Sequence, residues 1–234
     1  MDGFLIRKSA AASLFFAAFA LAAVVSSGAS AGDTGPDLLG TFVGTGGPVG
    51  AAGPAPEIVG DVCTKCHGPG GISVRSPFPS LAAQPATYLD TELGLFRDHA
   101  RSDPYAQAMM WGIARGLYEN RLSADQIKAI VDYYSSQPPP AGRPPANPAL
   151  AAEGKAIYDN GVAANNVPAC VTCHEPGAVG KEIFPRLAGQ HRSYLVRELK
   201  QFRSKLRESD IMQGNVKDMT DQQMEAVAEY LASL

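Results

Sequence analysis

The chain carries one motif twice, as Cys63-Thr64-Lys65-Cys66-His67 and again as Cys170-Val171-Thr172-Cys173-His174. Matching segments follow each copy. They are Phe78-Pro79-Ser80-Leu81-Ala82-Ala83-Gln84, Tyr88-Leu89, Glu92-Leu93 and Phe96-Arg97 in the first copy, and Phe184-Pro185-Arg186-Leu187-Ala188-Gly189-Gln190, Tyr194-Leu195, Glu198-Leu199 and Phe202-Arg203 in the second. The offset is 107 residues at the cysteines and a constant 106 from Phe78 to Arg97. A repeat of this length predicts two linked copies of one domain.

A proline-rich stretch separates the two copies. Residues 137–148 hold six prolines, and proline lacks an amide donor and restricts the residue before it, so we predict an extended, semi-rigid linker. The two domains are then residues 56–136 and 149–234. The offset falls to 97 residues where Leu122 matches Met219, so the first copy carries about nine extra residues before that point.

The N-terminal segment has the pattern of a targeting signal. A short basic region precedes a long apolar run, which ends in small residues with the pattern Ala29-Ser30-Ala31. This predicts a secretory signal peptide over residues 1–31, and hence an exported protein. The alternative is an uncleaved membrane anchor, because the uncharged stretch 9–32 is long enough to span a bilayer. Residues 32–55 follow as a flexible leader rich in glycine and proline.

Helical periodicity dominates both copies. Apolar residues at helical spacing predict helices over about 85–98 and 190–207, and the second of these includes Leu206 in its apolar face. Residues 148–158 predict a further helix at the start of the second copy. No segment has a convincing strand pattern, so we expect a fold that is mostly α.

The last helix of each copy has a clear start. Ser123 to Gln126 and Thr220 to Gln223 are capping boxes. Leu122 and Met219 directly precede them, at the position where a hydrophobic staple contacts the first turn of the helix.

Composition and charge narrow the function classes. The 234 residues are 45% hydrophobic and 18% charged, which is typical of a globular chain. The formal net charge is −3, and a nucleic-acid-binding domain would be basic, so we exclude that class. Eight of the ten basic residues of the second copy lie between Lys181 and Arg207. They form either a basic face or an ordinary solvated helix surface.

The repeated motif has the form C-x-x-C-H, which is the attachment site of a c-type haem. Two thiols at this spacing reach the two vinyl groups of one porphyrin, and the adjacent histidine then lies under the ring, where it binds the iron. We therefore predict two covalently bound haem c groups. The predicted attachment residues are Cys63, Cys66, Cys170 and Cys173, and the predicted iron ligands from the motifs are His67 and His174.

Three other interpretations of the cysteine pairs fit less well. Zinc ribbons space their pairs by about 15–20 residues, whereas these pairs lie 107 residues apart. Disulfides form in exported proteins, but they do not account for the histidine after each pair. A thioredoxin-type redox motif needs a βαβ pattern around it, which the sequence lacks.

The sixth iron ligand decides the chemistry, because methionine opposite histidine gives a closed site suited to electron transfer. In the second copy, Met219 and Met224 align with apolar residues of the first copy and have a packing role. Met212 has no such counterpart, and it falls in a predicted loop over residues 209–214. We therefore predict Met212 as the ligand of the second haem.

The first copy offers two adjacent methionines, Met109 and Met110, of which one binds the iron and the other packs. We favour Met110 and leave Met109 open. The spare histidines, His99 and His191, each lie near an arginine at or within an amphipathic segment. We expect them to be solvated surface residues and not ligands.

This arrangement resembles the dihaem cytochromes c of the cytochrome c4 family. The resemblance covers residues 57–234, and the F-P-x-L-A-x-Q and tyrosine–leucine segments are its more specific parts. It implies two tandem class I cytochrome c domains, related by a pseudo-twofold axis, in a periplasmic electron carrier. By position it implies Met110 and Met212 as the axial methionines. The chain departs from the family pattern at Met110, twelve residues before Leu122 where seven is usual, and at Glu175, where glycine is commoner.

Two functions of different classes follow. The first is an electron-transfer protein without substrate chemistry of its own, which links a dehydrogenase or a quinol-oxidising complex to a terminal oxidase. The alternative is the cytochrome subunit of an oxidoreductase complex, similar to flavocytochrome c sulfide dehydrogenase. A dihaem enzyme would need an open iron or a cysteine or second histidine ligand, whereas each copy here offers a methionine. An uncleaved N-terminus would add membrane association to either function.

Overall fold

The computed structural model describes residues 55–115 and 122–234, which belong to one structural unit, Gly46–Leu234. The predicted signal peptide at residues 1–31, and all but the last residue of the leader at 32–55, lie outside the described residues. Within the described ranges, no helix combines the length and the apolar character needed to cross a membrane.

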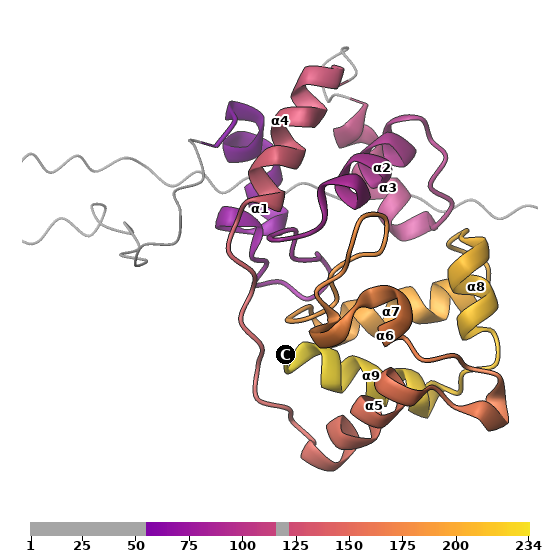
Figure 1. Ribbon diagram of the computed structural model, residues 1–234. Coiled ribbons are helices and arrows are strands. Elements are labelled where there is room, and N and C mark those ends of the chain that lie inside the picture. Colours follow the sequence, from indigo (N-terminus) through magenta and orange to yellow (C-terminus); the bar gives the residue numbers. More distant parts are fainter. Residues whose placement is uncertain (1–54, 116–121) are drawn as a thin grey trace, which may run out of the picture. The chain divides into compact units, whose positions relative to one another are not determined.

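The described chain consists of helices joined by loops, as Figure 1 shows. The first half contains η1 (Val59–Cys63), α1 (Thr64–His67), η2 (Pro69–Gly71), α2 (Ala86–Arg97), α3 (Pro104–Ala114) and α4 (Ala124–Ser135). The second half contains α5 (Pro148–Asn160), η3 (Ala163–Asn165), α6 (Val171–His174), η4 (Pro176–Ala178), α7 (Arg192–Arg203), α8 (Asp210–Val216) and α9 (Asp221–Ala232). The described residues form two isolated β-bridges, Val162 with Val167 and Lys181 with Phe184, and no strand. The prediction of a mostly α fold is confirmed.

Each half buries an apolar core of its own. In the first half α2 packs against α3 and α4, and in the second half α5 and α7 pack against α9. The first core consists of Val59, Leu89, Leu122, Ile127, Ile130, Val131 and Tyr134. The second core is larger and includes Tyr158, Leu195, Phe202, Val216, Met219, Met224, Val227 and Leu231. Two cores on two matching sets of helices are the structural counterpart of the sequence repeat.

The final helix of each half begins at its predicted capping box. Ser123 Oγ accepts from the Gln126 amide at 3.2 Å, and Gln126 Oε1 accepts from the Ser123 amide at 2.9 Å. Thr220 and Gln223 make the same pair of bonds before α9. Two of the four free amides at each helix start are thereby satisfied.

Helix α7 ends earlier than its periodicity predicts. Lys205 adopts a left-handed conformation with φ of 60°, and the amides of Leu206 and Arg207 both donate to the Gln201 carbonyl, at 2.9 and 3.2 Å. This turn closes the helix as a left-handed C-terminal cap does. Leu206 is therefore 49% exposed, and the prediction that it continues the apolar face of α7 was wrong.

Helices α5 and α9 cross at a glycine. A Cβ on Gly154 would lie 1.9 Å from the Ala226 carbonyl oxygen, so only glycine allows the two backbones to approach this closely. This crossing anchors α5 to the second core, whereas the shorter η1 and α1 segment opens the first half.

The two halves meet through a reciprocal exchange of hydrogen bonds. Gln84 Nε2 donates to the Arg186 carbonyl at 2.8 Å, and Gln84 Oε1 accepts from the Arg186 amide at 3.0 Å. Gln190, which matches Gln84 in the repeat, binds Ser80 in the same way at 3.1 and 2.9 Å. Ser80 and Arg186 are also matching positions, so the contact repeats when the halves are exchanged. A pseudo-twofold axis between the domains has this property.

The linker between the halves lies against the end of α9. Residues 137–147 form no helix or strand, and the Arg143 amide donates to the Ala232 carbonyl at 2.9 Å. The proline-rich segment therefore runs as extended chain that is fixed to the second half.

Candidate functional site

Both C-x-x-C-H motifs lie on short helical turns, α1 and α6. Their four cysteines are free and partly buried, and all four line the same cavity. Burial raises the pKa of the Cys63 thiol and raises that of Cys170 to about 11. A lowered pKa favours thiol exchange, so Cys63 and Cys170 do not have the character of the attacking cysteine in a thioredoxin-type redox pair.

The motif histidines are held in one orientation by backbone carbonyls. His67 Nδ1 donates to the Pro79 carbonyl at 2.8 Å, and His174 Nδ1 donates to the Pro185 carbonyl at 2.9 Å. A carbonyl only accepts, so the ring proton is on Nδ1 and the Nε2 lone pair is available to a metal. Burial lowers the pKa of both histidines, which favours the neutral form that binds metal.

The candidate methionines lie on helices, Met109 and Met110 on α3 and Met212 on α8. Ser209 precedes α8, and its Oγ accepts a hydrogen bond from the Met212 amide at 3.3 Å. Asp103 precedes α3, and its Oδ1 accepts a hydrogen bond from the Ala106 amide at 2.9 Å. These side chains act as N-caps, which favour helix over loop in the residues that follow. The prediction of a loop over residues 209–214 was therefore wrong, because it overlooked Ser209 as a cap.

The ends of α3 and α8 show which methionines correspond. Met110 lies four residues before the last residue of α3, and Met212 lies four residues before the last residue of α8. In this alignment Met109 matches Ile211, and the two are exposed to similar extents, 45% and 49%. Met110 and Met212 are both partly buried and line the cavity. This correspondence favours Met110 over Met109 as the residue that faces the site.

One cavity of about 460 Å³ extends through both halves. His67 and Met110 line it from the first half, and His174 and Met212 line it from the second. Much of the remaining lining is apolar, and includes Leu81, Leu89, Phe96, Leu187, Leu195 and Phe202. A haem c needs an apolar slot, two thiols and an imidazole with a free Nε2. The residues of each half supply all of these, so they fit the group.

A cluster of charged residues joins the halves beside the cavity. Arg207 binds Glu92 at 2.9 Å and Glu198 at 2.8 Å. Arg101 also binds both glutamates and, in addition, Asp103 at 2.5 Å. The two arginines match each other in the repeat, as do the two glutamates. Removal of one partner from such a buried pair leaves an uncompensated charge and is strongly destabilising.

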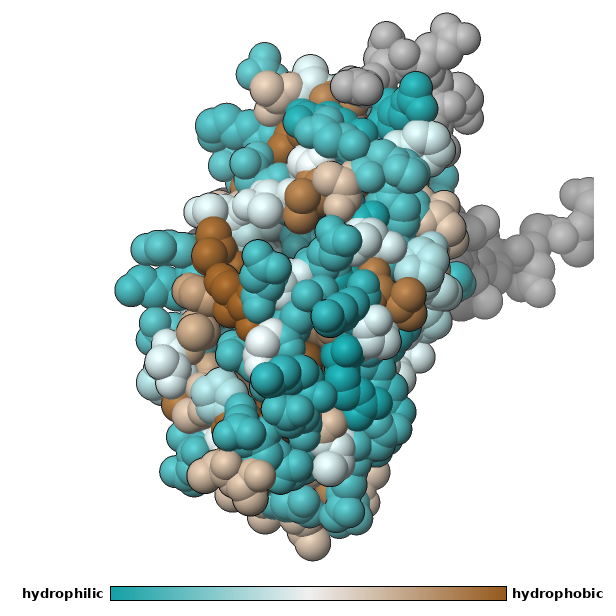
Figure 2. Space-filling model, turned by 90° about the vertical axis from the view of Figure 1, so that its right-hand side faces the viewer, coloured by the Kyte–Doolittle hydropathy of each residue, from teal (hydrophilic) through white to brown (hydrophobic). Residues whose placement is uncertain are grey.

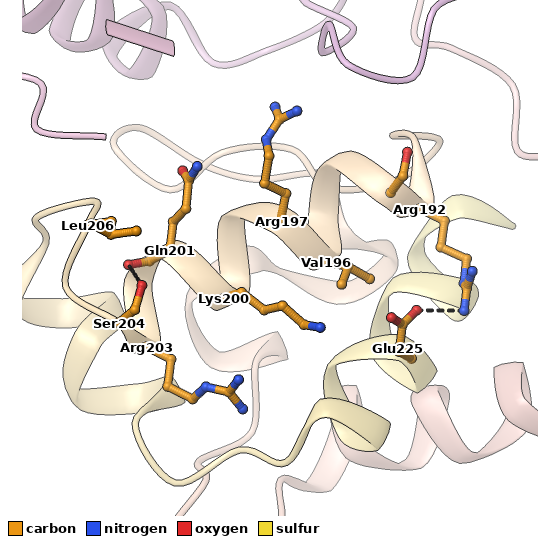
Figure 3. Close-up of a pocket in the computed structure, with 10 residues that line it drawn as sticks. Arg192, Val196, Arg197, Lys200, Gln201, Arg203, Ser204, Leu206 and Glu225 are labelled. Carbon is orange, nitrogen blue, oxygen red and sulfur yellow. Dashed lines mark hydrogen bonds and ion pairs between the residues drawn. The ribbon is translucent and has the colours of Figure 1, made fainter. Parts of the chain in front are cut away.

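The predicted basic face of the second half is largely neutralised. A shallow hollow along α7 is lined by Arg192, Arg197, Lys200 and Arg203, among others (Figure 3). Arg192 binds Glu225 at 2.6 Å. Asp221 binds Lys200 at 2.9 Å and Arg203 at 2.5 Å. These basic side chains form ion pairs with acidic neighbours, so the hollow is a helix surface whose charges are largely compensated. No motif cysteine or histidine lines it.

The molecular surface in the view of Figure 2 is mostly polar, with apolar side chains in several separate patches. The exposed apolar residues of the described chain include Tyr105, Met109 and Ile211 on the methionine-bearing helices. These three also line the cavity, so they lie where it approaches solvent.

The spare histidines differ in environment. His99 is exposed and stacks edge-on against Trp111, in agreement with a surface role. His191 is only 6% exposed, so the prediction that it is a solvated residue was wrong. Its Nδ1 accepts from Arg143 Nη1 at 3.0 Å, and its Nε2 donates to the Ser73 carbonyl at 2.9 Å. Both ring nitrogens are thereby used, between the linker and the first half.

Sequence reasoning missed the roles of the F-P-x-L-A-x-Q segments. They supply the carbonyls of Pro79 and Pro185 to the histidines, and the side chains of Gln84 and Gln190 to the domain contact. The signal was present, because the proline follows each histidine by 12 or 11 residues and the glutamine follows each proline by five.

Comparison with known proteins gives a consistent result along the chain. A family model for cytochrome c matches it twice, over residues 54–137 and 151–234. The chain is 38% identical over 185 residues to cytochrome c-552 of Acidithiobacillus ferridurans, with 79% of this chain and 78% of that protein covered. It is 39% identical over 178 residues to a thiosulfate dehydrogenase electron acceptor of Thiomonas intermedia, with coverage of 73% and 77%.

Solved structures show the same similarity. The cytochrome c4 of Acidithiobacillus ferrooxidans superposes with a TM-score of 0.68 at 37% identity, over 74% of this chain and 98% of that one. A thiosulfate dehydrogenase of Marichromatium purpuratum superposes with a TM-score of 0.61 at 30% identity. That match covers 73% of this chain but only 36% of the other.

Proposed function

The chain belongs to the cytochrome c family, as a dihaem member of the cytochrome c4 type, and from this premise we propose that it relays single electrons between redox partners in the periplasm. Its cofactors are two covalently bound haem c groups, which supply one-electron chemistry when bound. The proposed donor is a dehydrogenase or a quinol-oxidising complex, and the proposed acceptor is a terminal oxidase.

We assign the cofactor-binding residues as follows. Cys63 and Cys66 would attach the first haem, and Cys170 and Cys173 the second. The residues that would bind the irons are His67 with Met110 and His174 with Met212. The histidine orientation supports this assignment, because Nδ1 is engaged and Nε2 is free in both halves. With a histidine and a methionine of the protein bound to each iron, no coordination position would remain for a substrate, which would suit a carrier better than an enzyme.

The observation that carries the proposal is that both histidine–methionine pairs line one continuous cavity. The reciprocal glutamine contacts fix the two halves on each other, so the two sites keep a constant relation. A chain built in this way accepts an electron at one site and donates it from the other.

The names of two relatives favour a dehydrogenase as donor. The protein of Thiomonas intermedia is described as an electron acceptor of thiosulfate dehydrogenase, and a thiosulfate dehydrogenase is among the similar structures. We therefore propose a periplasmic dehydrogenase of an inorganic sulfur compound as the first donor to examine.

The test is stopped-flow electron transfer with the purified holoprotein. We expect a reduced thiosulfate dehydrogenase to reduce both haems at a rate that depends on protein concentration, and membranes that contain a terminal oxidase to reoxidise them. Failure of the oxidase membranes to reoxidise the reduced protein would contradict the proposed acceptor. Reduction by a quinol-oxidising complex, and not by the dehydrogenase, would reassign the donor.

A second candidate is the cytochrome subunit of an oxidoreductase complex, such as a flavocytochrome c sulfide dehydrogenase. The match to about a third of a longer thiosulfate dehydrogenase chain favours it, because there a similar domain pair is part of a larger enzyme. Co-purification from native periplasm and membranes separates the two. A stoichiometric flavoprotein partner, with no transfer by the free protein to an oxidase, would establish the subunit role.

The proposed location follows from the N-terminal segment. We propose that residues 1–31 are removed and that the mature protein begins at Gly32 in the periplasm. N-terminal sequencing of protein from periplasmic and membrane fractions tests this. Retention of residues 1–31 in the membrane fraction would instead make the protein an anchored carrier, with the assignment of the haems unchanged.

A further inference from the structure

Arg186 brings to the cavity a cation that has no ion pair within residues 55–115 and 122–234. It lines the cavity, and its backbone amide and carbonyl are both bound by Gln84. Its side-chain Nε is buried and has no hydrogen-bond partner. The other lining arginines of the described chain, Arg101, Arg197 and Arg207, all bind carboxylates. Arg186 is the exception among them.

A buried guanidinium N–H without an acceptor, here the Nε of the partly buried Arg186, is unfavourable, and native structures rarely leave such a group unsatisfied. Burial lowers the pKa of Arg186, and no anion of the described residues compensates its charge. The best partner for a guanidinium is a carboxylate, which it binds through two parallel hydrogen bonds. A haem c brings two carboxylates, on its propionate side chains.

The first half lacks this cation. The matching residue is Ser80, which is 4% exposed and neutral, and whose Oγ accepts from the Ser73 amide at 3.2 Å. The two halves therefore differ in charge at a position where their backbones make the same contact.

We propose that Arg186 is the counter-ion of a propionate of the second haem, and that it favours the reduced form of that haem. The proposal rests on attachment of the second haem at Cys170 and Cys173. The adjacent residue, Pro185, holds His174 by its carbonyl, so consecutive residues place the cation and orient the iron ligand. Reduction adds one negative charge to the site, which a fixed positive charge near it stabilises.

The test is a spectroelectrochemical titration of the holoprotein. In an Met110→Ala background, the remaining near-infrared methionine-to-iron band reports the second haem alone. Adding Arg186→Gln is expected to shift its equilibrium about tenfold toward the oxidised form, which corresponds to about 59 mV for one electron. Arg186→Lys keeps the charge, so its equilibrium is expected to stay close to the wild-type value.

The pH dependence gives a second readout. With Arg186 present the propionate stays ionised, so the potential of the second haem is flat near neutral pH. In Arg186→Gln the propionate binds a proton more readily, and the potential should rise as the pH falls. Arg203→Gln, on the same half but outside the cavity lining, is the matched control and should leave both readouts unchanged.

Two results would overturn the proposal. One is a second-haem potential in Arg186→Gln that equals the wild-type value and stays independent of pH. The other is a shift confined to the first haem, measured through the Met212→Ala background. Neither result depends on electron transfer to a partner, so the inference fails or stands separately from the proposed carrier function.

Discussion

Glu175 has a backbone conformation that side chains rarely adopt. Its φ of 65° and ψ of 158° are close to the 77° and 163° of Gly68, the matching residue of the first half. At Gly68 a Cβ would lie 2.1 Å from the Ile72 carbonyl oxygen. This region of conformational space is essentially reserved for glycine. The Tyr158 hydroxyl donates to the Glu175 carbonyl at 2.7 Å and helps to hold the peptide in place.

We therefore expect Glu175→Gly to stabilise the second domain by about 1–3 kcal/mol, the usual cost of such a conformation. Urea denaturation of the oxidised holoprotein measures the change. Gly68→Ala is the matched control and should destabilise the first domain, because its Cβ has no room. A denaturation midpoint for Glu175→Gly at or below the wild-type value would contradict the expectation.

His191 makes stability depend on pH. Its Nδ1 accepts a hydrogen bond from Arg143, so the ring must be neutral in the folded protein. Burial, and then the charge of Arg143, hold the pKa of His191 below its usual 6.5. Below pH 6.5 the unfolded chain thus binds a proton that the folded chain does not, and the free energy of unfolding falls as the pH decreases.

We expect His191→Gln to flatten this dependence below pH 6.5, by up to about 1.4 kcal/mol per pH unit. Denaturation midpoints at several pH values, for the variant and the wild type, give the difference that belongs to His191. His99→Gln, at an exposed site, should keep the wild-type slope. If the free energy of unfolding depends on pH equally in His191→Gln and the wild type, His191 does not cause the pH dependence.

At the residue scale, the sequence predicts what the motif contains but not what surrounds it. His67 and His174 follow from C-x-x-C-H, because that chemistry depends on adjacent residues. The burial of His191 between the linker and Ser73 depends on how the two halves dock. A local pattern carries no information on such a contact.

At the scale of elements, α3 and α8, the helices that carry the candidate methionines, begin at matching positions of the repeat but differ in length. Asp103 and Ser209 cap them at matching positions, and α3 is 11 residues long where α8 has seven. Four of the extra residues of the first half therefore lengthen α3. Residues 116–121, between α3 and Leu122, lie outside the described residues. Alignment from the C-terminal ends brings Met110 level with Met212.

We expect Met110→Ala to abolish about half of the near-infrared methionine-to-iron band of the oxidised protein, and Met212→Ala to abolish the other half. Met109→Ala is the control and should leave the band intact, since Met109 matches the exposed Ile211. If Met109→Ala removes half of the band and Met110→Ala does not, the alignment from the helix ends is wrong.

Helix starts were easier to predict than helix ends. Ser123 and Thr220 predict the starts of α4 and α9, because their side chains accept hydrogen bonds from free amides of the first turn. This signal depends only on residues close in the sequence. The end of α7 depends on Lys205, which takes a left-handed conformation without being glycine. Beyond this turn Arg207 binds Glu92 and Glu198, so the helix end coincides with a tertiary contact that helical periodicity does not indicate.

At the scale of the whole molecule, the repeat predicts two domains, but not the residues that join them. The glutamines of the F-P-x-L-A-x-Q segments were visible as matching positions. Their partners are backbone groups of the opposite half, which any residue type supplies, so sequence gives no signal for the pairing. The charge cluster was hidden for a similar reason, since Arg207 looked like one of eight bases on a helix surface.

We expect Gln84→Ala combined with Gln190→Ala to loosen the domain contact. Four hydrogen bonds across the contact are lost, each with a net value of about 0.5–1.5 kcal/mol, together with the bond from the His191 amide to Gln190 Oε1. Amide hydrogen exchange gives a direct measurement, because the Ser80 and Arg186 amides donate to these two side chains and should exchange faster. Gln137→Ala, which removes only a bond to Tyr133 within the first half, is the control. Unchanged protection of both amides would refute the expectation.

The reciprocal glutamine contact has a consequence for how such a chain arises. Each half contains both the side chain that reaches across and the backbone segment that receives it, so the surface is self-complementary, as in a twofold homodimer. A single ancestral domain with this surface would already pair with its own copy, and fusion of two genes would preserve the pairing. Once the two domains are joined by a peptide linker, their pairing no longer depends on protein concentration. It depends on a fixed effective concentration that the linker sets. Once fused, the copies are free to diverge, and Ser80 and Arg186 show that divergence at the shared interface itself.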